Sequence, residues 1–193
     1  NLNNNGLITF EKGIELLPYK PREFIQREIM TDAEIIANAG KDLFMDIESY
    51  PNYYLCAFKL HGTNKFIQLE CGEGKEFNSR FLSWIMQSYR TIGFNSNSFD
   101  LLIAWLSYHT QDTYKIKDAA NDIILNEMRS QELKKKYEFF TFKTPHIDLI
   151  EVAPLKGSLK LYGARLHSPR IQELPIDHMK ELTEEEIEIV KQY

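Results

Sequence analysis

Residues 42–48 read Asp-Leu-Phe-Met-Asp-Ile-Glu, and this stretch decides the fold. Residues 43–45 form a short apolar run, which is typical of a buried β-strand. Asp46 and Glu48 follow with one residue between them, so in a strand their carboxylates point to the same face of the sheet. Two like charges that close repel unless a cation lies between them, and hard oxygen ligands favour Mg²⁺ or Mn²⁺. A solvated turn at the strand end is the alternative interpretation.

The chain around this strand predicts a mixed α/β fold, with a sheet between helices. Residues 1–39 are expected to be an N-terminal arm that contains a short helix after the capping-box pattern Thr31–Glu34. Further strands are expected at 53–60, 65–69 and 91–94, with extended segments at 139–142 and 147–150. Helices are expected at 76–89, 99–109, 158–166 and 183–193, with one or two more over 116–136. No Gly-x-Gly-x-x-Gly is present, which argues against a doubly wound dinucleotide fold.

Composition narrows the functional classes. The 193 residues suit one domain, and 23 Lys and Arg against 28 Asp and Glu give a net charge of −5. That balance argues against a protein that holds duplex DNA by a general basic surface. Cys56 and Cys71 lack metal-like spacing, which indicates a reducing compartment such as the cytoplasm. No apolar run approaches the roughly 18–20 residues of a membrane span, so no membrane partner is expected.

A second acidic position lies about fifty residues after the first. Residues 93–100 read Gly-Phe-Asn-Ser-Asn-Ser-Phe-Asp, so that a strand ends, a polar turn follows and Asp100 opens a helix. An Asp at this place can simply cap the helix. The same position also aims its carboxylate at the sheet edge where Asp46 and Glu48 are expected.

These two motifs carry a resemblance to a known family. Asp46-Ile-Glu48 and Asn95-Ser-Asn-Ser-Phe-Asp100 resemble the first and second motifs of the DEDD 3′–5′ exonuclease superfamily, whose fold is RNase H-like. The stretch from His146 to Pro175 resembles the exonuclease part of bacteriophage DNA polymerases. The resemblance covers residues 40–193 and implies an RNase H-like α/β domain with a mixed sheet flanked by helices.

The resemblance also implies a mechanism: a proofreading-type exonuclease that uses two Mg²⁺ or Mn²⁺ ions to release nucleoside 5′-monophosphates from a DNA 3′ end. Asp46 would bridge both ions, Glu48 would bind the first ion, and Asp100 would bind the second. Tyr193 matches the Tyr of the third motif, Tyr-x-x-x-Asp, and would orient the attacking water. The fourth carboxylate, expected four residues later, is absent from this sequence, so the domain is expected to be truncated at its C-terminal end. Asp148 is a candidate substitute, although a structural role near a strand end is favoured.

Single-stranded ends bind through base stacking and backbone contacts. Phe94, Asn95 and Phe99 are candidates for gripping the terminal nucleotides, with core packing as the alternative for the two Phe residues. A cationic cluster that could follow the phosphates, or simply form a solvated helix face, comprises Lys156, Lys160, Arg165, His167 and Arg170.

The expected partner is a single-stranded DNA 3′ end, with a polymerase domain on the same or a separate chain, in a bacterial host cytoplasm. Two alternatives stay open. One is a catalytically incomplete nucleic-acid-binding or interaction module of the same fold, and the other is a structure-specific endonuclease.

Overall fold

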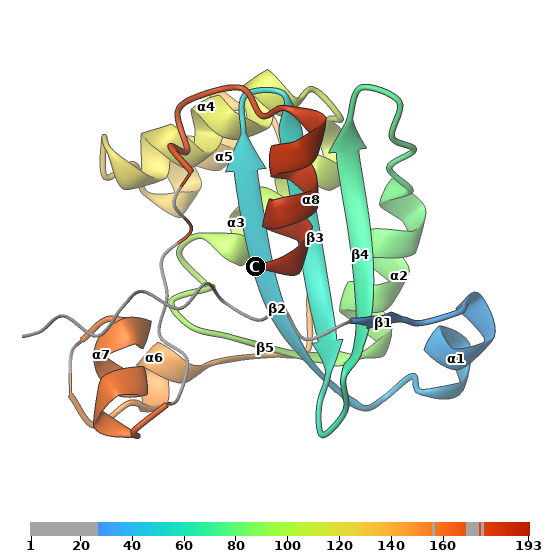
Figure 1. The fold of residues 1–193 in the computed structure, drawn as a ribbon. Helices are drawn as coiled ribbons and strands as arrows, with labels where there is room; N and C mark the ends of the chain where they lie inside the picture. Colours follow the sequence, from blue (N-terminus) through green and yellow to red (C-terminus); the bar gives the residue numbers. More distant parts are fainter. Residues whose placement is uncertain (1–26, 156, 169–173, 175) are drawn as a thin grey trace, which may run out of the picture.

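A mixed six-stranded sheet forms the centre of the computed structural model, which describes residues 27–155, 157–168, 174 and 176–193 (Figure 1). The strand order is β1-β4-β3-β2-β5-β6. The strands are β1 (Glu28–Ile29), β2 (Asp42–Tyr50), β3 (Tyr53–Leu60), β4 (Lys65–Gly72), β5 (Arg90–Gly93) and β6 (His146–Asp148). The chain therefore has the predicted α/β class, with the acidic stretch on a central strand.

Strands β2, β3 and β4 form an antiparallel meander, and the strands on either side of it are parallel to their neighbours. The turn between β3 and β4 includes Gly62, whose φ of 74° suits glycine. On β2, Asp46 pairs with Ala57 and Glu48 pairs with Leu55 along the full length of β3. In contrast, β5 pairs with β2 only between positions 42 and 44.

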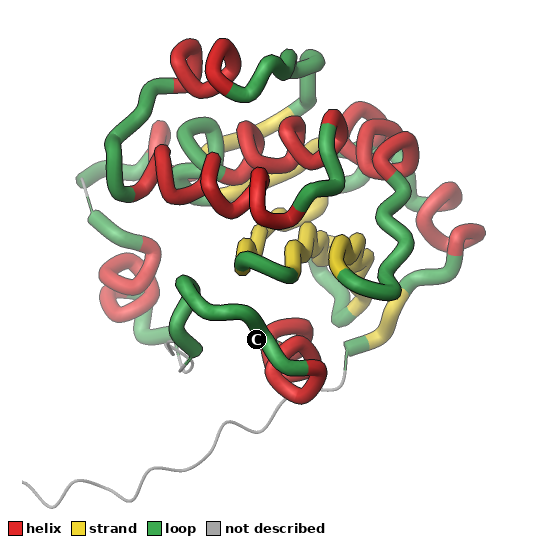
Figure 2. The backbone as a smooth tube through the Cα atoms, turned by 90° about the horizontal axis from the view of Figure 1, so that it is seen from above, coloured by secondary structure: helices red, strands yellow, loops and turns green. Residues whose placement is uncertain are grey.

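Helices cover both faces of the sheet. Figure 2 shows α8 on one face and the bundle of α2, α3 and α4 on the opposite face. The helices are α1 (Asp32–Ala37), α2 (Ser79–Ser88), α3 (Asp100–His109), α4 (Thr113–Ile124), α5 (Ser130–Lys136), α6 (Leu149–Val152), α7 (Leu159–Arg165) and α8 (Glu184–Gln192). The capping box predicted at Thr31 and Glu34 is present at the start of α1.

The alternation along β2 divides its side chains between two cores. Leu43, Met45 and Ile47 are buried in the larger core beneath α2, α3 and α4. The other face carries Phe44, Asp46, Glu48 and Tyr50. Of these residues, Tyr50 belongs to the smaller core beneath α8. That smaller core consists of Tyr50, Tyr53, Leu55, Leu182, Ile187 and Val190. The prediction that the two carboxylates share one face is therefore confirmed.

The one or two helices expected over 116–136 are two, α4 and α5, and Glu127 between them adopts a left-handed φ of 51°. The expectation for residues 139–142 is wrong. Residues 139–142 form no strand. Their rings pack on α3 instead, with Phe142 at 5.0 Å from Trp105 and Phe140 at 4.3 Å from His109 between ring centroids. The aromatic enrichment of this segment thus reflects packing rather than strand pairing.

The extended segment expected at 147–150 is only partly correct, since β6 ends at Asp148 and α6 begins at the next residue. Cys56 and Cys71 are both buried and free of disulfides. Within the residues described above, no helix is long and apolar enough to cross a membrane.

Candidate active site

Asp46 lies at the junction of two hollows. The hollow on the sheet face, which we call the face hollow, is also lined by Glu48, Ala57 and Tyr193. The hollow at the sheet edge, which we call the edge hollow, is also lined by Asp100 and residues of the preceding loop. The edge hollow exists because β5 stops pairing with β2 before Asp46, which leaves the rest of β2 open on that side.

Asp100 is the first residue of α3 and is 8% exposed. The preceding residue, Phe99, makes no side-chain cap. The backbone N–H groups of Ile47 and Asp100 act to lower the pKa of the Asp100 carboxyl, which places that carboxyl near the β2 backbone. Asp100 therefore serves its own helix terminus and also faces Asp46.

All three carboxyl groups have raised pKa values. Burial is the largest cause for each of them, because it disfavours the charged form. The charge of Asp46 adds to this effect and helps to raise the pKa of Glu48 to about 8 and that of Asp100 to about 7. Asp46 itself keeps an exposed surface within the hollows, yet its pKa is also raised. Without a cation, Glu48 and Asp100 therefore ionise at higher pH than ordinary carboxyl groups do.

A buried lysine, Lys117, lies near Glu48. Lys117 on α4 is only 5% exposed, and burial lowers its pKa, while the charges of Asp177 and Glu48 act in the opposite direction. No motif in the sequence singles out Lys117. One signal could have found it: Lys117 is four residues after Thr113 and three before Ala120, so it lies on the buried stripe of α4.

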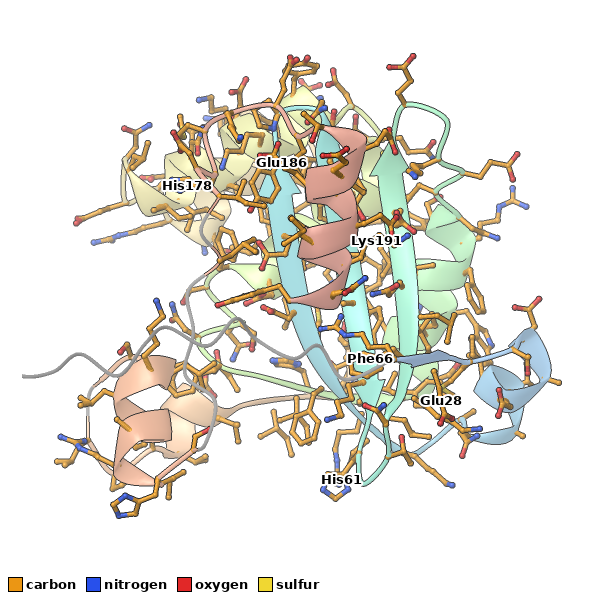
Figure 3. The ribbon with its side chains drawn as sticks, in the orientation of Figure 1. Glu28, His61, Phe66, His178, Glu186 and Lys191 are labelled. Atoms are coloured by element: carbon orange, nitrogen blue, oxygen red, sulfur yellow. The ribbon has the colours of Figure 1, made fainter. Side chains whose placement is uncertain are left out.

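The position of Tyr193 depends on how α8 is held against the sheet. In the turn between β2 and β3, the Asn52 amide donates to the Leu182 carbonyl and its oxygen accepts from the Leu182 N–H, both at 2.8 Å. Near the other end of α8, Lys191 lies 3.3 Å from a carboxylate oxygen of Glu70 on β4 (Figure 3). These contacts place Tyr193 on the wall of the face hollow, beside Asp46 and Glu48.

Asp148 is occupied by structural contacts. It is 4% exposed, and its two oxygens accept hydrogen bonds from the backbone N–H groups of Asn95, Asn97 and Ile150, at 2.7, 2.8 and 3.2 Å. This is the structural role that the sequence favoured. Asp148 ends β6, and its charge also helps to raise the pKa of Asp100.

The candidate nucleic-acid residues fall into two groups. Phe94, Asn95 and Phe99 line the edge hollow together with Asp46 and Asp100, and Phe99 also packs against the larger core. The cationic residues Lys160, Arg165 and His167 are exposed on or just after α7 and line neither hollow. Lys156 and Arg170 lie outside the described residues.

One chain of contacts links α7 to the loop. The Arg165 guanidinium lies 5.9 Å from the Tyr162 ring centroid, and that ring lies 5.8 Å from the ring of Phe94. A cation is therefore held two side chains away from the edge hollow.

The donor set fits a hard divalent cation in its chemistry, because carboxylate oxygens are the ligands that Mg²⁺ and Mn²⁺ prefer. The side chains are not grouped as a metal site, however. Across the residues that the structure describes, no three or more His, Cys, Asp and Glu side chains form a group that could hold a metal ion. A shared ion would thus require the three carboxylates to turn toward one another.

Comparison of the chain with protein-family models, with curated proteins and with solved structures finds no match in any of the three.

Proposed function

We propose that this chain is a metal-dependent 3′–5′ DNA exonuclease of the DEDD type, acting on single-stranded 3′ ends as in proofreading. One observation supports the proposal. Asp46 and Glu48 on β2 lie near Asp100 at the start of α3, and each of the three carboxyl groups has a raised pKa. A fold does not gain stability from crowding three carboxylates, so the arrangement favours a role that needs them. Holding divalent ions at a phosphodiester is such a role.

In this proposal the chain supplies the ligands and the orientation. Asp46, Glu48 and Asp100 would hold the ions, which when bound supply an activated water and stabilise the leaving oxygen. Tyr193, on the wall of the face hollow, would orient the attacking water through its hydroxyl group. The edge hollow would receive the end of the strand, where Phe94 and Phe99 offer rings for the bases.

The RNase H-like fold is part of the same proposal. It is supported by a mixed sheet in which an antiparallel meander, β2-β3-β4, is extended by two parallel strands on the side of β2. Helices on both faces and an acidic residue at the middle of the first long strand agree with it. We extend the proposal to a polymerase domain, on the same or another chain, as the partner that presents the strand.

The test is the polarity of cutting. With Mn²⁺, the chain should shorten a 5′-labelled single strand stepwise from its 3′ end and release mononucleotides. It should leave a circular single strand intact. Asp46→Ala should abolish cutting, whereas Asp32→Ala, in the first turn of α1, should not. Internal cuts in the circular strand would support the endonuclease alternative and contradict the proposal.

A second candidate function is a binding module of the same fold that does not cut. It is supported by one observation: the described His, Cys, Asp and Glu side chains form no group of three or more that could hold a metal ion. A module should bind the same strand equally well in EDTA and in Mn²⁺, and Mn²⁺ should not raise its melting temperature. An exonuclease should be stabilised by Mn²⁺ through mass action on the native state, and Asp46→Ala should remove that shift.

A further inference from the structure

The loop between β5 and α3, residues 94–99, has a backbone conformation that its own residues do little to stabilise. Asn95 adopts a left-handed φ of 58°, a backbone conformation that residues other than glycine seldom adopt. Gly93 precedes it, and a Cβ atom there would lie 2.4 Å from the Ser96 hydroxyl. Such a loop persists only where its surroundings fix it.

The surroundings that fix this loop belong to β6 and α6. Asp148 accepts the Asn95 and Asn97 N–H groups on separate oxygens, at 2.7 and 2.8 Å. His146 shares hydrogen bonds through Nε2 with the Ser96 hydroxyl at 2.7 Å, and through Nδ1 with Thr91 at 2.8 Å. The loop is therefore held at three successive residues by the neighbouring strand.

The end of this loop sets the position of Asp100. The Ser96 carbonyl accepts from the N–H groups of Phe99 and Leu101, at 3.3 and 2.9 Å, so the loop continues directly into the first turn of α3. Asp100 lies in that turn against the repulsion of Asp46, and only a rigid backbone can keep two like charges in place. The backbone on the other side of Asp46 is β2, which is already fixed by its pairing with β3.

We propose that Asp148 is the positioning residue of the candidate active site: by clamping residues 95–97, it holds Asp100 opposite Asp46 and Glu48. This inference rests on the proposed function in so far as the positioned carboxylate is a metal ligand. It assigns Asp148 no contact with the ions or the strand. The acidic side chain is required because it must accept from several backbone N–H groups at once, which a neutral amide cannot do with both of its atoms.

The experiment compares Asp148→Asn with Asn78→Ala. Asn78 caps α2 by accepting the Phe81 N–H at 3.0 Å, so its loss removes a side-chain-to-backbone bond of the same kind away from the site. Asp148→Asn should expose the Asn95 and Asn97 amides to hydrogen exchange. Because the Asp148 charge also helps to raise the pKa of Asp100, the carboxyl ¹³C signals of Asp46 and Asp100 are compared without metal at about pH 10, where these groups are ionised in both chains, and they should shift in Asp148→Asn. At neutral pH the variant should bind Mn²⁺ about tenfold to a hundredfold more weakly. Asn78→Ala should lower the melting temperature and change none of these readouts.

The outcomes separate this inference from the proposed function. Unchanged carboxyl signals in Asp148→Asn, with the Asn95 and Asn97 amides deprotected, would overturn the positioning role. If the parent chain binds no Mn²⁺, the proposed function fails, while the carboxyl signals still decide whether Asp148 positions Asp100. If Asp148→Asn does not fold, Ser96→Ala removes only the bond to His146. It should move the Asp100 signal in the same way, and an unmoved signal would overturn the inference.

Discussion

The Glu48 carboxyl makes stability depend on pH. Its pKa is 4.5 in an unperturbed chain and about 8 in the fold, because burial and the charges of Asp46 and Asp100 oppose ionisation. The folded state therefore binds this proton more tightly than the unfolded state. The stability that results is fully present below pH 4.5 and is lost as the pH rises toward 8. Asp100 acts in the same direction between its ordinary 3.8 and about 7.

We therefore expect Glu48→Gln to flatten the pH dependence of unfolding. In EDTA, the parent chain should lose stability between pH 5 and pH 9, and the variant should be the more stable of the two at pH 9. The difference should be on the order of 2 kcal/mol, since one pKa unit corresponds to about 1.4 kcal/mol and the coupled carboxyls share the effect. Urea unfolding at both pH values measures it. Glu73→Gln, an exposed change, is the control, and equal slopes for all three chains would contradict the expectation.

Lys117 supplies the opposite charge at this site. Its ammonium group favours the ionised form of Glu48, so Lys117→Met should raise the pKa of Glu48 above its value of about 8 in the parent chain. The matched control is Lys115→Met, because Lys115 is exposed on the same helix. Titration of the Glu48 carboxyl by ¹³C NMR in EDTA distinguishes the two variants. A Glu48 pKa that stays the same in Lys117→Met would show that the two charges do not interact.

At the scale of the element, the sequence predicts what depends on local pattern. The strand around Asp46 and Glu48 follows from its alternation, and the start of α3 at Asp100 follows from the polar turn before it. The position of the break between α4 and α5 does not, because it depends on Glu127 accepting a left-handed conformation that nothing nearby in the sequence requires. The segment expected to be extended at 139–142 forms no strand, and the Phe142 ring packs against rings on α3.

The candidate site also combines features that follow from local sequence pattern with features that do not. Spacing predicts that Asp46 and Glu48 share one face of β2 and that Asp100 opens α3, and the structure has both features. Asn52 and Asp148 are different, because their partners lie 130 and about 50 residues away in the chain. Contacts of that kind arise from the register of the sheet, and single-sequence periodicity does not contain them.

Asn52 is the residue on which the placement of α8 depends. Its side chain makes two hydrogen bonds with Leu182, just before the helix begins, and both groups are partly buried. Asn52→Ala leaves both Leu182 groups unpaired, which should cost about 1–3 kcal/mol. Urea unfolding measures this cost. Hydrogen exchange at Ile187 and Val190 should show that α8 loosens before the rest of the fold.

The control for Asn52 is Gln87→Ala. Gln87 bonds only to Ser83 within its own helix, on an exposed surface, so its loss should cost little. If exchange at Ile187 and Val190 stays the same in Asn52→Ala, then the packing of Leu182, Ile187 and Val190 holds α8 without the turn.

At the scale of the whole molecule, the charge distribution works against a nucleic acid. The net charge is −5, and Asp46, Glu48 and Asp100 add local negative charge as they ionise, although Arg27 and Lys59 also line the face hollow. The exposed cations on α7 are set apart from both hollows. A strand should therefore reach the site only when that negative charge is neutralised, and its grip should depend on stacking more than on phosphate contacts.

This balance predicts how strand binding responds to ions. Fluorescence anisotropy with a short labelled single strand should show weak binding in EDTA and clearly tighter binding in Mn²⁺, because divalent ions offset the repulsion from Asp46, Glu48 and Asp100. At fixed Mn²⁺, the logarithm of the binding constant should fall with the logarithm of salt concentration with a slope of only about −1 to −2, as for two or three phosphate contacts.

Phe94→Ala should weaken binding by about 1–3 kcal/mol without changing that slope, since a ring contributes stacking and no charge. Arg165→Ala should make the slope shallower by less than one unit. A slope of −5 or steeper would mean that a basic surface carries the strand, and it would move the proposed track away from the two hollows around Asp46.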